Sequence, residues 1–219
     1  MIIITKKDKM ASLLYYCKID TSEIENSLFD LCSLSKKAVN FHRNIDKKLS
    51  LYPELLLRYY ICQQKKVSND SIVFDVTNYG KPYCKTYNDI QFNISHSNDA
   101  FVLLLSNSNV GIDLEKIVNF NFDGILKLFT KNEREYILYN KTKDIIDFYK
   151  VWTAKEAYTK YLGVQLIRIL PRKINYNKIE QFYFEDYIIS IYRKNKDPIK
   201  MIKITEYDIL QMARNIYLF

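Results

Sequence analysis

Residues 110–115 read Val-Gly-Ile-Asp-Leu-Glu, and this alternation of apolar and acidic side chains predicts a β-strand. On a strand, side chains two residues apart point to the same face, so Asp113 and Glu115 are expected to lie together. Ile112 and Leu114 are then expected to be buried on the other face. Two carboxylates held beside a buried strand face indicate a cation-binding site rather than an ordinary solvated strand end.

A second segment, residues 152–160, reads Trp-Thr-Ala-Lys-Glu-Ala-Tyr-Thr-Lys and is predicted to be helical. Trp152, Glu156 and Lys160 recur at intervals of four and share one stripe of the helix, with Lys155 beside it. Together the two segments offer three carboxylates and two ammonium groups. Magnesium prefers hard oxygen ligands, usually a few carboxylates completed by water and substrate phosphates. The two segments therefore predict a site for a magnesium-bound polyphosphate.

The composition indicates a globular protein. The chain has 219 residues, of which 48% are hydrophobic and 26% charged, enough for one large domain or two small ones. The apolar run at residues 1–5 is cut off by lysines and is too short for a signal peptide, and no stretch has the length of a membrane span. A cytoplasmic protein is therefore expected. Four scattered cysteines without zinc-binding spacing are expected to be reduced and buried: Cys17, Cys32, Cys62 and Cys84.

The formal net charge of +8 has two interpretations. It can indicate an acidic partner, such as nucleic acid, a phosphorylated cofactor or an acidic protein surface. It can equally follow from a composition rich in Lys, Ile, Asn and Tyr and poor in Gly and Pro, which AT-rich codon usage alone produces. The charge by itself does not choose between them.

The order of predicted elements divides the chain into two α+β halves. Residues 106–109 (Ser-Asn-Ser-Asn) are the best candidate for a linker, so we expect one half at residues 1–108 and the other at 109–219. A cleft between two such halves is a favoured place for a ligand. In the first half, strands are expected at 2–4, 11–18, 92–95 and 100–105, helices at 22–40 and 46–64, and turns at 79–82 and 96–99. In the second half, strands are expected at 110–115, 182–192 and 199–205, and helices at 121–140 and 145–162.

Four segments carry a resemblance to a known family. They are residues 80–82 (Gly-Lys-Pro), 92–97 (Phe-Asn-Ile-Ser-His-Ser), 110–115 and 148–160. In this order and with these gaps they resemble the signature motifs of the 4′-phosphopantetheinyl transferases, specifically the larger two-domain type that activates surfactin synthetase. The resemblance implies a pseudo-dimeric fold of two similar α+β halves, with the active site in the cleft between them.

The resemblance implies an enzyme that transfers the 4′-phosphopantetheine arm of coenzyme A to a serine of an apo acyl or peptidyl carrier protein. The reaction releases 3′,5′-ADP and uses Mg²⁺. It also implies that the first half binds coenzyme A and that the second half carries the metal and the catalytic groups. A monomer without a nucleic-acid or membrane partner is expected.

By the same resemblance, Asp113, Glu115 and Glu156 are the magnesium ligands, and Asp113, Glu156 and Lys160 are catalytic. Glu156, or a water bound to the metal, is implied as the base that takes the proton from the carrier serine. Lys160 is implied to meet a phosphate of coenzyme A or to protonate the leaving group.

The other residues that match the family's motifs are implied to bind coenzyme A. Ser95 and His96 match its positions for the coenzyme A phosphates, and Lys155 resembles a further phosphate contact. Lys81 matches a lysine placed against the adenine-nucleotide end.

Two assignments are open at this point. The basic residue that contacts the 3′-phosphate maps onto Lys47 or Lys48, of which Lys48 is carried forward. In the family, the segment after the first acidic motif recognises the carrier, and here it offers an apolar strip with a basic border. Any amphipathic helix shows the same pattern. The strip consists of Ile125, Leu128 and Phe129, and its border consists of Lys127 and Lys131.

Two other classes of function compete with the transferase. A basic chain with 15% aromatic residues can be a nucleic-acid-binding module in which bases stack on tyrosines. Such a module would not need the three acids, which repel a phosphate backbone unless a metal is bound. A magnesium-dependent phosphohydrolase or nuclease would use the same acids with water as the nucleophile. It has no evident need for the segment with Ser95 and His96.

Overall fold

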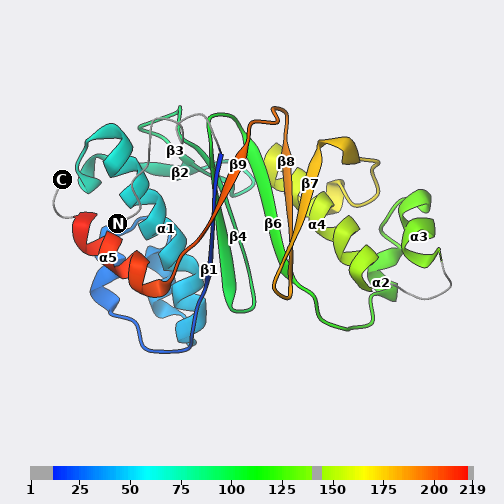
Figure 1. The fold of residues 1–219 in the computed structure, drawn as a ribbon, viewed down its shortest axis with the longest axis horizontal. Helices are drawn as coiled ribbons and strands as arrows, with labels where there is room; N and C mark the ends of the chain where they lie inside the picture. Colours follow the sequence, from blue (N-terminus) through cyan, green and yellow to red (C-terminus); the bar gives the residue numbers. More distant parts are fainter. Residues whose placement is uncertain (1–11, 140–144, 217–219) are drawn as a thin grey trace.

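Two β-sheets pack face to face and form the centre of the molecule (Figure 1). The computed structural model describes residues 12–139 and 145–216, so the strand expected at residues 2–4 lies outside the described residues. The first sheet contains, in spatial order, β4 (Gln91–Ser97), β5 (Ala100–Ser106), β1 (Ser12–Lys18) and β9 (Ile199–Lys203). The second contains β6 (Val110–Lys116), β8 (Tyr187–Arg193) and β7 (Ile179–Phe184).

Apolar side chains from the inner faces of both sheets form a shared buried core. β1 shows how this core arises, because its side chains are buried on both faces of the strand. Leu14 and Tyr16 contribute to the core between the sheets, whereas Leu13, Tyr15 and Cys17 pack toward the helices of the first half. A strand buried on both faces reads as a continuous apolar run, which is the pattern of residues 12–17.

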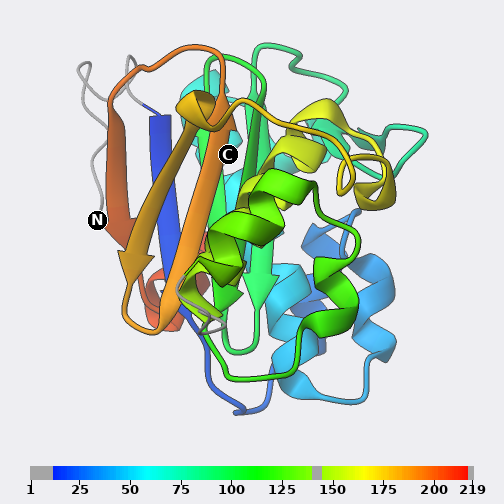
Figure 2. The same cartoon turned by 90° about the vertical axis from the view of Figure 1, so that its right-hand side faces the viewer.

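Helices cover the outer faces of the two sheets. In the first half these are α1 (Asn44–Lys65) and α5 (Glu206–Ile216), and in the second α4 (Ile145–Leu162), flanked by α2 (Asp123–Leu126) and α3 (Lys131–Leu138). Figure 2, which looks from the second half, shows the helices of that half nearest the viewer. Each half therefore consists of a sheet with a long helix on its outer face, and the expected α+β arrangement of two halves is confirmed.

The remaining elements are short. A hairpin of β2 (Phe74–Val76) and β3 (Pro82–Cys84) carries the turn expected at residues 79–82. The 3₁₀ helices are η2 (Asn26–Leu31), η3 (Lys36–Asn40), η4 (Asn69–Ser71), η5 (Leu166–Arg168) and η6 (Tyr176–Lys178).

Two expected helices are wrong in extent. The helix expected at residues 22–40 is replaced by η2 and η3, because the buried Glu54 carboxylate accepts hydrogen bonds from the backbone N–H groups of residues 33–35. Those donors are thereby unavailable for a continuous helix. The helix expected at 121–140 is divided into α2 and α3 by a capping box, in which Thr130 and Glu133 bond to each other's backbone N–H.

The grouping of the chain's last elements is also corrected. Residues 199–216, expected in the second half, return to the first: β9 pairs in parallel with β1, and α5 packs against α1. β9 supplies hydrogen-bond partners to the otherwise open edge of β1. The apolar stripe of α5 is buried against the first half and comprises Ile209, Met212, Ala213 and Ile216.

The four cysteines are free and buried, as expected. Burial raises the pKa of each thiol, so none has the low pKa of a reactive cysteine. Within residues 12–139 and 145–216, no helix has the length and apolar character needed to cross a membrane.

Candidate active site

β4 and β6 lie side by side where the two halves meet, and side chains rather than a backbone ladder join them. In the described part of the chain, β4 pairs with β5 alone and β6 with β8 alone. Three small polar residues alternate along β4, at positions 93, 95 and 97, and each side chain accepts a hydrogen bond from a backbone N–H of β6. We call this contact the β4–β6 seam. The bonds run from Ile112 N to Asn93 Oδ1 (2.8 Å), from Leu114 N to Ser95 Oγ (3.2 Å) and from Lys116 N to Ser97 Oγ (3.2 Å).

The two serines of the seam also hold the acidic side chains of β6. Ser95 Oγ donates to Asp113 Oδ1 over 2.9 Å, and Ser97 Oγ donates to Glu115 Oε2 over 2.8 Å. Asp113 is only 2% exposed, and among the described residues its Oδ2 has no hydrogen-bond partner. A buried carboxylate oxygen without a partner is costly, so the site favours a bound cation at this oxygen.

Helix α4 brings a carboxylate and an ammonium group to the same place. It packs so closely on β6 that a Cβ on Gly111 would lie 2.0 Å from the carbonyl oxygen of Ala157, so only glycine fits there. Lys160 Nζ lies 2.7 Å from both Asp113 Oδ1 and Ser95 Oγ. Its distance to Glu156 Oε2 is 3.9 Å.

The charge of Asp113 disfavours the ionised forms of Glu115 and Glu156. Burial, followed by the charge of Asp113, raises the pKa of Glu156 to about 7, although Lys160 acts in the opposite direction. Burial and the charge of Asp113 also raise the pKa of Glu115, and the hydrogen bond from Ser97 and the neighbouring Trp152 partly offset this rise. One lysine thus faces three carboxylates. The site therefore carries excess negative charge, which a bound cation would neutralise.

The carboxylates are the type of ligand that a magnesium ion prefers, although they are not yet arranged around a common point. Among residues 12–139 and 145–216, no three acidic, histidine or cysteine side chains are grouped closely enough to form a ready-made metal site. Here the Lys160 ammonium stands against Asp113 Oδ1, where it provides the positive charge. Hard oxygen donors, the unpaired Asp113 Oδ2 and the mutual repulsion of the acids all suit Mg²⁺.

Two family models match consecutive parts of the chain. The model described as 4′-phosphopantetheinyl transferase, N-terminal, matches residues 32–109, and the model described as 4′-phosphopantetheinyl transferase superfamily matches residues 109–196. The chain belongs to this superfamily. The two matches meet at the start of β6, beside the seam that holds Asp113 and Glu115.

Curated relatives carry the same description. The chain is similar to the 4′-phosphopantetheinyl transferase gsp of Aneurinibacillus migulanus, with 36% identity over 65% of this chain and 62% of that protein. It is 30% identical to the 4′-phosphopantetheinyl transferase Sfp of Bacillus subtilis over 58% of each chain. It is also 30% identical to the 4′-phosphopantetheinyl transferase pptA of Paxillus involutus, over 68% of this chain and 65% of that one. The chain thus covers less than two thirds of these relatives' own length.

His96 lies on the side of the site that faces the first half of the chain. Desolvation by the surrounding protein atoms and the charge of the Lys160 ammonium lower the pKa of His96. The charges of Asp46 and Asp113 partly offset this. Asp46 belongs to the first turn of α1, and Arg43 donates two hydrogen bonds of 2.7 Å to its carboxylate. His96 therefore stands between the start of α1 and the carboxylates of the second half.

The expected role of Lys48 is wrong. Its side chain is 1% exposed and lies on the α5 side of α1. Lys48 Nζ lies 2.6 Å from Asp20 Oδ1, 2.8 Å from Glu206 Oε2 and 2.7 Å from Ser22 Oγ. With these partners its ammonium is not free to meet a phosphate. The alternative, Lys47, is half-buried on the same helix.

The expected role of Lys155 is wrong as well. Successive residues of a helix point about 100° apart, so Lys155 leaves the stripe of Glu156 and Lys160 and enters the core. Its fully buried ammonium bonds to Glu133 Oε1 over 2.9 Å and to backbone carbonyls of the segment after α4. Lys155 therefore anchors α4 from behind and does not face the site.

Lys81 joins the two halves near the start of β6, at the end of the seam that is farther from Glu115. Its Nζ donates to Asn109 Oδ1 (2.6 Å), Val110 O (3.1 Å) and Tyr161 O (3.4 Å), and burial lowers the pKa of this lysine to about 8. A cavity of about 710 Å³ opens beside it, lined in part by Tyr79, Lys81, Tyr83 and Tyr161. The nucleotide contact expected of Lys81 stays a prediction.

Sequence reasoning gave no role to Asn93 and Ser97, two members of the seam. A signal was present, because small polar residues at positions 93, 95 and 97 alternate along one face of a strand. The pattern shows that this face meets polar groups. It does not show that those groups are the backbone of β6 and the carboxylates of the site.

Proposed function

We propose that this chain transfers the 4′-phosphopantetheine arm of coenzyme A to a serine of an apo acyl or peptidyl carrier protein and releases 3′,5′-ADP. The observation that carries the proposal is the buried Asp113, with one oxygen unpaired, beside Lys160 and Glu156 at the seam between the halves. The curated relatives, which are named for this transfer, support it. No feature of the site calls for a nuclease or a nucleic-acid-binding module instead.

Asp113, Glu115 and Glu156 would hold Mg²⁺. When bound, the ion supplies positive charge that stabilises the phosphate groups as the pyrophosphate link breaks. Glu156 accepts the proton of the carrier serine, directly or through a water. Lys160 neutralises or protonates the leaving phosphate from one helical turn away.

The coenzyme A phosphates would lie along the seam. Ser95 and Lys160 already bond to each other beside Asp113, and His96 flanks them toward the first half. The nucleotide end would extend toward Lys81, whose three bonds to protein oxygens a phosphate would have to rearrange. Ser95, His96 and Lys81 thus keep the binding roles expected of them, as parts of this proposal.

The carrier protein would dock on the segment that follows β6. Leu128 is 40% exposed, and Val118 and Phe120 add exposed apolar surface before α2. Phe129, expected in the strip, is instead buried in the core of the second half, so the strip is narrower than predicted. Lys127 and Lys131 border it and suit an acidic carrier. A monomer in the cytoplasm remains our expectation.

Incubation of the purified protein with coenzyme A, Mg²⁺ and an apo carrier protein tests the proposal. The expected result is a mass gain of one phosphopantetheinyl group on the carrier, with 3′,5′-ADP formed in equal amount. Hydrolysis of coenzyme A without change in the carrier would favour the phosphohydrolase. No turnover with a panel of peptide-synthetase, polyketide and fatty-acid carriers would contradict the proposal.

A further inference from the structure

The end of the seam nearest Glu115 is closed by an ionic network around Asp99. Asp99 lies in the turn between β4 and β5, two residues after Ser97. Its carboxylate accepts a hydrogen bond from Tyr187 Oη over 2.5 Å and lies 3.3 Å from Lys116 Nζ. Both partners belong to the second half, so Asp99 ties the tip of a first-half hairpin to β6 and β8.

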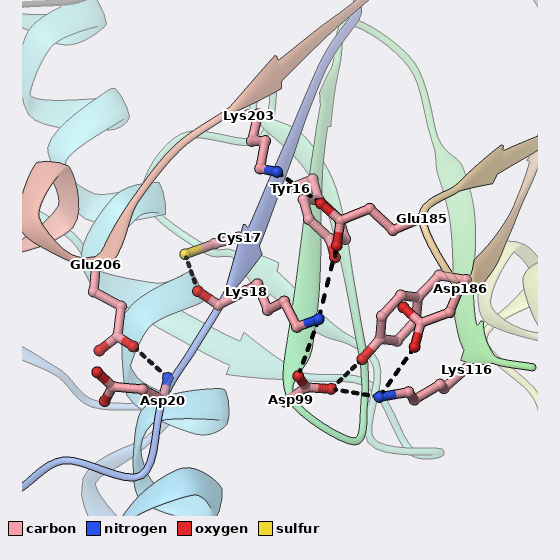
Figure 3. Close-up of polar contacts among 11 residues, drawn as sticks. Tyr16, Cys17, Lys18, Asp20, Asp99, Lys116, Glu185, Asp186, Lys203 and Glu206 are labelled. Carbon is pink, nitrogen blue, oxygen red and sulfur yellow. Dashed lines mark hydrogen bonds and ion pairs between the residues drawn. The ribbon is translucent and has the colours of Figure 1, made fainter.

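Figure 3 shows how widely this network reaches. Three lysines face three carboxylates, and each comes from the end of a strand or from a turn, so the network holds the same ends of both sheets together. The charges balance, and therefore the network is not itself a site for an ion. Its further pairs are Lys18 with Asp99 (3.5 Å) and Glu185 (3.8 Å), Lys116 with Asp186 (3.1 Å), and Lys203 with Glu185 (2.7 Å).

Lys116 connects this network to the carboxylates of the site. It is the last residue of β6 and follows Glu115 directly. Its backbone N–H bonds to Ser97 Oγ, while its ammonium meets Asp99. Any shift of the hairpin tip relative to β6 would therefore change the position of Ser97 against Glu115.

Side chains of β4, and no backbone ladder, make the hydrogen bonds of the seam that resist such a shift. Its three bonds use side chains, each worth about 0.5–1.5 kcal/mol, and they lack the second backbone partner that a ladder provides. Contacts at the ends therefore add to the bonds of Ser95 with Asp113 and of Ser97 with Glu115 in holding the register of β4 against β6. Lys81 provides one end and Asp99 the other.

We infer that Asp99 is a positioning residue for Glu115: by binding Lys116 and Tyr187, it keeps the Ser97 hydroxyl where it orients the Glu115 carboxylate toward a divalent cation. The inference rests on the proposed function, which assigns Glu115 to the metal. Partners that orient a ligating carboxylate affect metal affinity strongly, by about 10- to 100-fold when removed. Asp99 acts one step further out, through Ser97.

The single tryptophan of the chain provides a direct readout. Trp152 lies one helical turn from Glu156 on α4 and is close enough to Glu115 to act on the pKa of that carboxyl, so its emission reports on a cation bound there. Mn²⁺ takes the same oxygen ligands as Mg²⁺ and quenches fluorescence. We expect saturable quenching of the full-length protein, without coenzyme A.

Four variants separate positioning from charge. Asp99→Asn and Tyr187→Phe should each raise the half-saturating Mn²⁺ concentration about three- to tenfold, less than the effect of Ser97→Ala at about 10- to 100-fold. Tyr187→Phe keeps the ring in the core and the net charge, so it also carries the test if Asp99→Asn folds poorly. Glu185→Gln is the matched control, because it removes a carboxylate of the same network that touches neither β4 nor β6. It should leave Mn²⁺ binding within about twofold of the wild type.

Each outcome is informative. Asp99→Glu, which retains the carboxylate, should recover part of the affinity, and thermal unfolding of every variant separates metal binding from stability. Unchanged binding in both Asp99→Asn and Tyr187→Phe would overturn the inference alone. Equal weakening in Glu185→Gln would also overturn it and leave a simple charge effect. Absence of saturable binding in the wild type would instead refute the metal site of the proposed function, and the inference with it.

Discussion

At the scale of single residues, Asp113 is the side chain on which the site depends most. Asp113→Ala should lower transfer activity at least about a hundredfold, because the variant loses a buried ligand for the cation. Its thermal unfolding temperature should stay close to that of the wild type, because losing the Oδ1 bonds to Ser95 and Lys160 is offset by removing a buried oxygen without a partner and the repulsion of Asp113 on Glu156. Transfer to an apo carrier, followed by mass spectrometry, measures the first effect. Asp89→Ala, on an exposed acid paired with Lys65, is the control.

Glu156 gives a prediction for stability against pH. Its pKa is raised from 4.5 to about 7 in the folded chain, so the folded state holds this proton more tightly than the unfolded state. The stabilisation is present below about pH 4.5 and is lost as pH rises through about 7. Glu156→Gln removes this loss. The metal-free variant should match the wild type near pH 5 and exceed it near pH 8 by on the order of 1–3 kcal/mol.

Thermal or denaturant unfolding in the presence of a chelator, at both pH values, measures this difference. Transfer activity of Glu156→Gln should fall at the same time, because the amide cannot accept the serine proton. A variant less stable than the wild type near pH 8 would show that the pairing of Glu156 with Lys160 outweighs the repulsion from Asp113 and Glu115.

At the scale of elements, α1 carries the buried Lys48, and the exposed Arg43 is its N-cap residue; we expect Lys48 to stabilise the fold and Arg43 to contribute a phosphate contact to coenzyme A. Lys48→Met should cost about 1–3 kcal/mol of stability, because Glu206 loses a buried partner while Asp20 stays solvated. It should leave the KM for coenzyme A unchanged. Arg43 is exposed and lies beside Asp46, near His96, so Arg43→Ala should do the reverse.

The loss expected for Arg43→Ala is that of one phosphate contact, about 1–3 kcal/mol of coenzyme A binding, which should appear in KM. Steady-state kinetics with coenzyme A as the varied substrate, together with thermal unfolding, compares the two variants. A raised KM in Lys48→Met with normal stability would restore the original assignment of the 3′-phosphate to Lys48.

At the scale of the whole molecule, the last segment decides whether the first half can fold. A chain ending at residue 198 lacks β9 and α5, so the edge of β1 and the apolar face of α1 lose their cover. Four side chains of α5 are buried, and the three large ones, Ile209, Met212 and Ile216, are each worth about 1.5–3 kcal/mol. Their sum approaches the total stability of an ordinary domain, roughly 5–15 kcal/mol. We expect the shortened chain to be unfolded or aggregated, as circular dichroism and gel filtration would show.

A shortened chain that kept the wild-type spectrum and melting temperature would mean that residues 199–216 are an accessory to the first half. A chain with Lys203→Met, which loses the ion pair of β9 with Glu185 and the contact of this ammonium with the Phe184 ring, is the control and should fold normally.

Local pattern in the sequence was sufficient for much of this protein. The alternation over residues 110–115 placed Asp113 and Glu115 on one face and buried Ile112 and Leu114, as the structure shows. The spacing of four set Glu156 and Lys160 on one stripe of α4. These features depend only on the repeat of a strand or a helix, which short stretches of sequence contain. The α+β class followed from the same repeats.

Only the tertiary structure decided which surface each element meets. Lys48 and Lys155 look like available cations in sequence, yet each is buried against carboxylates far along the chain. The pairing of β9 with β1 and the contact of Asp99 with Lys116 at the end of the seam likewise join segments that are distant in the sequence. Periodicity states which side chains share a face but carries no information on what packs against that face, because partner choice depends on the burial and charge of the whole folded chain.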